Sequence, residues 1–266
     1  MKAADQASTK SSVQSLAKAF KVLEAVASAE VEMTLSETAA AAGLDPGTTH
    51  RMLKTLVDLG YVARGDDKRF SLTLKVLDLG FRAIGRRDMR VIARPILRSL
   101  VGEVSEAASL GVLSGSDILY VERMRAGITR LGVDIRVGTL IPAATSVIGW
   151  AILAFLPKQE RERVLSTESR QRDFPSLKDR DRLRAELVQT RKQGYALSGS
   201  HVTSGLEVLA VPICDQDGYP IAAISVAAPS MRMTLDELRT TALGPVQVAA
   251  SQIARALEAS GGTVAG

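Results

Sequence analysis

The chain has 266 residues, of which 46% are apolar and 24% charged, and it carries a single cysteine, Cys214. This length exceeds what one small core usually holds, so we expect two domains, and the composition excludes a largely disordered chain, a collagen and a disulfide scaffold. The longest uninterrupted apolar run, 147–156, has ten residues, whereas a membrane-spanning helix needs about 20. The first ten residues lack the charged-then-apolar order of a secretory signal, so we expect a cytoplasmic protein without a membrane span.

The net charge of +5 permits binding to a polyanion, but the basic surplus lies outside the N-terminal third. Residues 1–73 contain nine Lys or Arg and nine Asp or Glu. Residues 82–98 contain six Arg against one acid, and 158–192 contain eleven bases against seven acids. We interpret the arginine-rich stretch as a solvated helix face. Any binding of nucleic acid by the N-terminal third must therefore depend on local arrangement.

A disordered tail is expected over residues 1–12, followed by an amphipathic helix with one buried face. The apolar residues of this helix recur at steps of three and four, namely Val13, Leu16, Phe20, Leu23 and Val26. Further on, Thr34 precedes Glu37 by three residues, which is the spacing of a capping box, and Gly43 supplies a stop. This pattern predicts a second helix over 34–42.

A third helix is expected after the short break GLDP. Asp45 is its predicted N-cap, Pro46 occupies the first helical position, and the helix ends at Gly60. Beyond it, YVAR and RFSLTL are typical of two short strands around the charged tip GDDK. Three helices and a two-stranded wing predict a winged helix-turn-helix over 13–74.

The third helix has two faces. The face expected to pack on the first two helices carries Thr49, Leu53, Leu56, Val57 and Gly60. The opposite face, which a recognition helix offers to the major groove, carries Gly47, Thr48, Arg51, Lys54, Thr55 and Asp58, with His50 at its border. On the wing, the candidates for phosphate contacts are Arg64, Lys68 and Arg69. The alternative is that both sets of side chains are merely solvated.

The rest of the chain alternates between strand and helix patterns. Helical spacing predicts a linker helix over 75–94, and Pro95 is expected to start a new helix. Strands are expected over 111–115, 117–124 and 129–139, a buried helix over 145–156, polar helices over 158–193, a polar loop over 198–205, a hairpin of 205–213 with 219–228, and a closing helix over 234–258. This mixture predicts an α+β sensor or catalytic domain over 95–260.

Few residues suggest catalysis. HExxH, CxxC, GxSxG and the phosphate-binding GKS or GKT motifs are all missing from the sequence. His201 lies in a polar loop far in sequence from Cys214, which we expect to pack as a small apolar group. We therefore assign no catalytic residue, metal or cofactor, although a Ser/His pair that uses His201 stays open. A small-molecule hydrolase or transferase with an accessory winged helix is one alternative, and a ligand-free DNA-binding protein is another.

The run TLSETAAAAGLDPGTTHRMLKTLVDLGYVARGDDKRFSLT resembles the winged helix of the isocitrate lyase regulator (IclR) family of bacterial transcription factors, and THRMLKTL followed by GYV resembles that family's recognition-helix signature. The resemblance continues in VGTLIPAATSVIGWAILAFLP, GYALSGSHVTSGLEVLAVPICDQDG and AAISVAAP, so it covers residues 13–258. It implies an N-terminal winged helix-turn-helix, a linker helix and a C-terminal GAF-like effector-binding domain. It also implies a palindromic operator on double-stranded DNA, a homodimer or homotetramer, and regulation as a repressor or activator.

The resemblance places an effector cavity in the C-terminal domain, among Val133, Ile141, Val147, Ile148, Ser198, Val208, Ser225 and Ala227. Thr145 and Ser146 precede an apolar helix, and the free amides at that helix start, as far as Gly149, could hold a carboxylate. Family members commonly carry acids where this chain has Ser198 and His201, and a basic residue where it has Trp150. Apolar walls with a few hydroxyls predict a small organic acid as effector, with an aromatic acid as one candidate, and His201 could add charge. The alternative is that these residues are only core strands and a capped helix.

Overall fold

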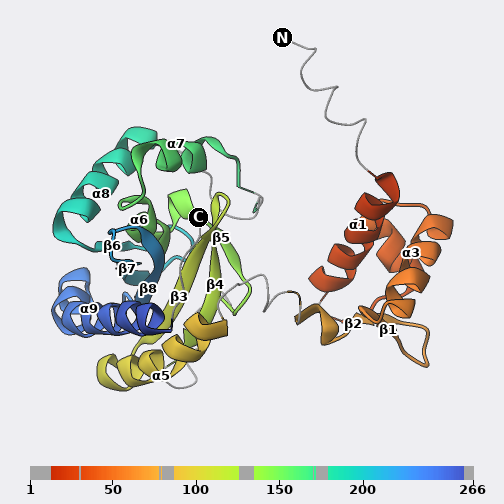
Figure 1. The fold of residues 1–266 in the computed structure, drawn as a ribbon, viewed down its shortest axis with the longest axis horizontal. Coiled ribbons are helices and arrows are strands. Elements are labelled where there is room, and N and C mark those ends of the chain that lie inside the picture. Colours follow the sequence, from red (N-terminus) through yellow and green to blue (C-terminus); the bar gives the residue numbers. More distant parts are fainter. Residues whose placement is uncertain are drawn as a thin grey trace, which may run out of the picture. The chain divides into compact units, whose positions relative to one another are not determined.

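The computed structural model describes residues 13–29, 31–77, 79, 87–125, 135–169, 171 and 179–260. The chain divides into two compact units, residues 1–85 and 86–266, and each is described by itself (Figure 1). The expected disordered tail, 1–12, and the central part of the expected linker helix, 75–94, lie outside the described residues. The domain boundaries at 74 and 94 stay predictions. None of the described helices is long and apolar enough to cross a membrane.

The first unit is a winged helix-turn-helix, as predicted. Its elements are α1 (Gln14–Ser28), α2 (Leu35–Ala42), α3 (Pro46–Asp58), β1 (Val62–Arg64) and β2 (Phe70–Leu72). The two strands pair antiparallel, and Met33 forms a bridge to Phe70 that extends the wing toward α2. The buried core of the unit consists of Val22, Ala25, Val26, Ala42, Leu53, Leu56, Val62 and Phe70.

The apolar stripe of α1 is only partly buried, so one expectation is wrong. Val26 is buried and Leu23 is half-buried, but Val13, Leu16 and Phe20 are 66%, 57% and 55% exposed. The short length of α2 contributes to this exposure. At 1.5 Å per residue, the 15 residues of α1 reach about 22 Å, whereas the eight residues of α2 reach about 12 Å and cannot cover the first two turns of α1.

The second unit is α+β and is built on a six-stranded antiparallel sheet in the order β5-β4-β3-β8-β7-β6. The strands are β3 (Ala107–Ser114), β4 (Asp117–Met124), β5 (Leu140–Pro142), β6 (Ala196–Gly199), β7 (Leu206–Cys214) and β8 (Pro220–Pro229). The helices are α5 (Arg87–Val104), the short 3-10 helix η2 (Ala143–Thr145), α6 (Val147–Leu153), α7 (Lys158–Ser166), α8 (Arg180–Gln193) and α9 (Leu235–Ala259). α5 and α9 cover one face of the sheet, while α6 covers the other, with α7 and α8 outside it (Figure 1).

Three expectations for this unit need correction. Pro95 lies inside α5 rather than at a helix start; it is exposed, and so is Val91 one turn earlier, so the carbonyl that loses its helical partner lies on the solvent side. Residues 135–139 form a turn with Gly138 at φ +94° and not a strand, and 126–134 lie outside the described residues. Residues 196–199 form the edge strand β6, where a polar loop was expected from 198 onward.

Candidate DNA-reading helix and effector site

Side-chain caps fix the starts of both helices of the helix-turn-helix. At α3, the Thr48 N–H donates to Asp45 Oδ1 (2.8 Å). At α2, the Glu37 N–H donates to Thr34 Oγ1 (3.3 Å), and the Thr34 N–H donates to Glu37 Oε2 (2.7 Å). These amide hydrogen bonds hold the pKa of Asp45 and of Glu37 below their usual range. Both predicted caps are confirmed, and Gly43 at φ +63° ends α2 between them.

α3 presents a polar face to solvent. The predicted residues that are exposed on it are Gly47, His50, Arg51, Lys54 and Thr55. The opposite side packs into the unit, with Leu53 at 0% and Leu56 at 7% exposure. An exposed row of donors on a capped helix has the chemistry that reads base edges in the major groove. The individual DNA contacts stay predictions.

Thr48 is an exception to this placement. Only 7% of it is exposed, so its assignment to the open face is wrong. Side chains in the first helical turn point back toward the helix N-terminus, which for Thr48 is the turn between α2 and α3. Its hydroxyl accepts a hydrogen bond from Arg51 Nη2 (3.3 Å), so Thr48 positions Arg51.

Lys68 and Arg64 extend from the wing. Lys68 is exposed near the tip and adopts a left-handed backbone conformation with φ +62°. Arg64 is exposed on β1, and its guanidinium carbon lies 5.9 Å from the centre of the Phe70 ring. Both cations can therefore approach a phosphate.

Arg69 is held within its own unit. Its Nη1 donates to the Glu32 carbonyl oxygen (2.8 Å), and its guanidinium lies 3.5 Å from the carboxylates of Glu37 and Asp67. Arg69 therefore ties the wing to the start of α2, and a phosphate would compete with these partners.

The α6 face of the sheet collects several predicted effector residues. Ser198, Val208 and Ala227 are partners in register across β6, β7 and β8. Ser225 lies one row away on the same face, because it is two residues from Ala227 on β8. Ser225 is in turn the partner of Ser109 on β3, and the two serines are 5% and 1% exposed.

Arg123 completes this polar row, although no pattern in the sequence predicts it. It is the cross-strand partner of Ser109, and its Nη1 donates to Ser109 Oγ (2.8 Å). Strict alternation along β4 would place Arg123 on the face opposite Ile118 and Tyr120. A bulge between the pairs Leu110/Glu122 and Gly111/Tyr120 adds one residue to β4 and reverses the alternation. An alternating pattern in the sequence therefore could not locate this arginine.

The start of α6 is already capped. The Gly149 N–H donates to Ser146 Oγ (3.2 Å). This amide was expected to bind a carboxylate of the ligand, but it is already occupied. Gly149 is instead needed for packing, since a Cβ there would lie 2.1 Å from the Ala143 carbonyl oxygen. Thr145 Oγ1 is buried without a hydrogen-bond partner among the described residues. Val147 and Ile148, the first two residues of α6, are buried, and their role in the effector site stays a prediction.

His201 and Trp150 lie together at one edge of this face. Their ring centroids are 5.3 Å apart, His201 is exposed, and Trp150 Nε1 donates to the Ala144 carbonyl oxygen (2.9 Å). Ile141 is buried on β5 in the same apolar cluster as α6, while Val133 lies outside the described residues.

Little in the titratable groups of this unit suggests catalysis. Burial raises the pKa of Tyr120 to about 12 and also raises that of the Cys214 thiol, which disfavours a thiolate. Among the described residues, no group of three His, Cys, Asp or Glu side chains could hold a metal ion.

A capped helix-turn-helix with a wing, followed by an α+β unit with a polar row under one helix, defines a DNA-binding regulator with a second domain. Residues 15–66 match the IclR helix-turn-helix domain, and residues 81–255 match the domain described as "Bacterial transcriptional regulator IclR C-terminal". The chain therefore belongs to the IclR family of DNA-binding transcriptional regulators.

Individual relatives agree with this assignment. The Pca regulon regulatory protein of Pseudomonas putida is 31% identical over 239 residues, which is 90% of this chain and 81% of that protein. The transcriptional repressor IclR of Escherichia coli is 31% identical over 245 residues, covering 90% and 88%. The crystal structure of an IclR homologue from Microbacterium hydrocarbonoxydans in complex with 4-hydroxybenzoate has a TM-score of 0.78, with 27% identity over 92% of this chain and 99% of that one.

Proposed function

We propose that this regulator binds a palindromic operator as a dimer or dimer of dimers, with paired α3 helices in successive major grooves and Lys68 on the flanking phosphates. One recognition helix reaches only a few base pairs, so a two-fold pair doubles the contacts that specify a site. The exposed donors of Arg51 and Lys54 on a capped helix support this role.

The proposed effector is a small organic acid whose carboxylate lies at the row formed by Arg123, Ser109 and Ser225. This row is the observation that carries the proposal. A guanidinium hydrogen-bonded to a buried serine, with a second serine opposite, offers the donors that a carboxylate accepts. The α6 start, our first candidate for this contact, is a weaker choice because Ser146 already accepts the Gly149 amide.

An aromatic body is the better fit for the rest of the ligand. Next to the polar row, the sheet carries small residues in register, Ala107 opposite Ala227 and Gly111 opposite Ala223. Ile148 and Ile118 already pack over Gly111, so a flat ring would pack at the other end of the row, over Ala227 and beside Val208. The 4-hydroxybenzoate bound by the Microbacterium homologue is an acid of this type.

Coupling to the DNA-reading unit would run through β4. Glu122 and Arg123 are neighbours that point to opposite faces, and Glu122, 3% exposed, accepts a hydrogen bond from Arg90 Nε on α5 (2.9 Å). A ligand that moves Arg123 therefore strains an ion pair to the helix at the start of the second unit. Binding must favour one arrangement of α5 over another, since equal affinity for both shifts nothing.

The test is calorimetry with benzoate-type and aliphatic acids on the wild type, Ser225→Ala and Arg123→Gln, with Ser114→Ala at the exposed end of β3 as control. We expect aromatic acids to bind the wild type and the control alike, and to bind the two site variants at least tenfold more weakly. A gel shift with operator DNA should respond to the same acids. Equal binding by Arg123→Gln, or binding of aliphatic acids alone, would contradict the assignment of the anchor or of the ligand class.

A further inference from the structure

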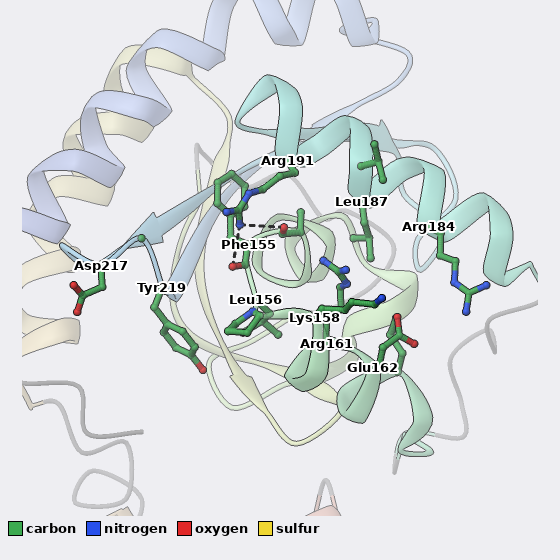
Figure 2. A pocket seen from close by; sticks show the side chains of 15 residues that line it. Phe155, Leu156, Lys158, Arg161, Glu162, Arg184, Leu187, Arg191, Asp217 and Tyr219 are labelled. Atoms are coloured by element: carbon green, nitrogen blue, oxygen red, sulfur yellow. Dashed lines mark hydrogen bonds between the residues drawn. The ribbon is translucent and has the colours of Figure 1, made fainter.

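A separate pocket of about 920 Å³ lies between the end of α6, α7, α8 and the β7–β8 turn (Figure 2). None of its lining residues belongs to the proposed effector site. We propose that this pocket is a second ligand site, which takes an organic anion with an apolar body. Its volume lies within the range of small-molecule sites, about 300 to 1,000 Å³.

Long-range hydrogen bonds hold the walls of the pocket. At one end, Arg191 Nη1 on α8 donates to the carbonyl oxygens of Ala154 (3.4 Å) and Phe155 (3.0 Å), and its guanidinium carbon lies 4.7 Å from the Phe155 ring centre. At the other end, the Tyr219 hydroxyl donates to Glu160 Oε1 on α7 (2.8 Å). The pocket is therefore preformed and does not need a ligand to assemble it.

The floor of the pocket is apolar and its sides are basic. Apolar side chains from the segment after α6, from α7 and from α8 line it, namely Phe155, Leu156, Leu165, Leu187 and Val188. Val188 is 70% exposed, which leaves apolar surface open at the mouth. Four cations line it as well, namely Lys158, Arg161, Arg184 and Arg191, against the two acids Glu162 and Asp217.

Two of these cations are the ones a ligand would engage. Arg191 is occupied by the carbonyl oxygens of Ala154 and Phe155, and Arg184 pairs with Asp181 one turn before it (3.2 Å). The side chains of Lys158 and Arg161 form no hydrogen bond or ion pair with any residue that the structure describes. Both extend from the same face of α7 toward Leu187 (Figure 2).

This arrangement selects the ligand class. Two cations beside exposed apolar surface attract a molecule that brings negative charge and apolar area together, because the anion is neutralised while its body leaves water. A neutral apolar compound would leave both cations without a partner, and a small inorganic anion would not cover the exposed side chain of Val188. A carboxylate or sulfonate on a ring system satisfies both requirements.

The probe is 1-anilinonaphthalene-8-sulfonate, an aromatic sulfonate whose fluorescence rises in apolar surroundings, titrated into the full-length protein. The double variant Lys158→Gln/Arg161→Gln removes both cations. Lys192→Gln removes one charge from α8 outside the pocket and serves as the control. We expect the dissociation constant to rise at least tenfold in the double variant and less than twofold in the control, with circular dichroism unchanged in both.

A second pair of variants tests at which of the two sites the dye binds. Val188→Trp fills the mouth from an exposed position and should abolish binding, whereas Ser225→Ala, in the proposed effector site, should leave it unchanged. Equal affinities in the wild type, the double variant and Val188→Trp would overturn the proposal. Loss of binding in Ser225→Ala alone would also overturn it, because the dye would then occupy the effector face.

Discussion

Gly149→Ala should destabilise the second unit, because α6 sits directly on the backbone of η2. An ideal Cβ at this position lies 2.1 Å from the Ala143 carbonyl oxygen, 2.6 Å from its Cα and 2.7 Å from its carbonyl carbon. All three atoms are backbone, so no side chain can rotate away, and the two helices must separate. Overpacking of this kind costs about 1 to 3 kcal/mol. Contacts with three backbone atoms place this case at the upper end of that range, about 3 kcal/mol. Alanine is the better helix former by about 1 kcal/mol, so we expect a net loss of about 2 kcal/mol.

Urea unfolding followed by tryptophan fluorescence measures this loss of stability with a probe that lies in α6. The chain has one tryptophan, Trp150, which is 5% exposed on α6 next to the substitution. The matched control is Gly102→Ala in α5, where no described atom lies within 4 Å of the added Cβ. That variant should be more stable than the wild type by about 0.5 to 1 kcal/mol, since alanine loses less backbone entropy in a helix.

The same substitution should weaken effector binding, because α6 carries Val147 and Ile148 over the sheet. Ile148 already packs closely on Gly111, whose ideal Cβ would lie 2.8 Å from Ile148 Cδ1, so a displaced α6 has no room to settle lower. If Gly149→Ala unfolds at the same urea concentration as the wild type, α6 does not contact η2 as described and the reasoning is refuted.

Four further substitutions test the DNA-reading unit. Arg51→Ala should reduce the free energy of binding to the operator by about 1 to 3 kcal/mol and relax base choice at one position per half-site. Lys68→Ala should weaken binding to operator and random DNA alike. Both effects are measured by fluorescence anisotropy across salt concentrations. Leu53→Ala, at a position with 0% exposure, should lower the free energy of unfolding of this unit by about 2 to 5 kcal/mol, measured by circular dichroism in urea. Asp45 has a lowered pKa in the folded chain because it accepts a hydrogen bond from the Thr48 amide. Its contribution to the stability of the unit is therefore complete above the ordinary aspartate pKa of about 4, and is lost as the pH falls through the lower pKa of the folded state. Melting curves of Asp45→Asn between pH 7 and pH 3 should therefore change less with pH than those of the wild type.

The sequence predicts the helix-turn-helix well because its signals are local. A capping box, an N-cap followed by proline, and a glycine stop each specify a hydrogen bond within four residues, and the structure contains those bonds at Thr34, Asp45 and Gly43. The register of the third helix then follows from its capped start. Exposure of Arg51 and burial of Leu53 result from that register alone.

Burial that depends on a distant partner is harder to predict. The spacing of Val13, Leu16 and Phe20 correctly predicts a helix, but it contains no information on where the covering helix ends. The burial of Thr48 was also missed, because a helical wheel ignores the backward tilt of side chains in the first turn. Arg123 depends on a bulge in β4, and a single added residue reverses which side chains face α6.

The basic segment 158–192 shows what tertiary structure adds to a composition argument. Eleven bases against seven acids predict solvated polar helices, and most side chains of α7 and α8 are indeed exposed or half-buried. The i,i+3 spacing of Lys158 and Arg161 places them on one face of a helix, but spacing cannot say what lies opposite. In the folded chain the opposite wall is Leu187 and Val188 on α8. Lys158 and Arg161 therefore lie beside apolar surface and not on a fully solvated helix. An anion with an apolar body gains more binding free energy there than it would from the charges or from the apolar surface alone.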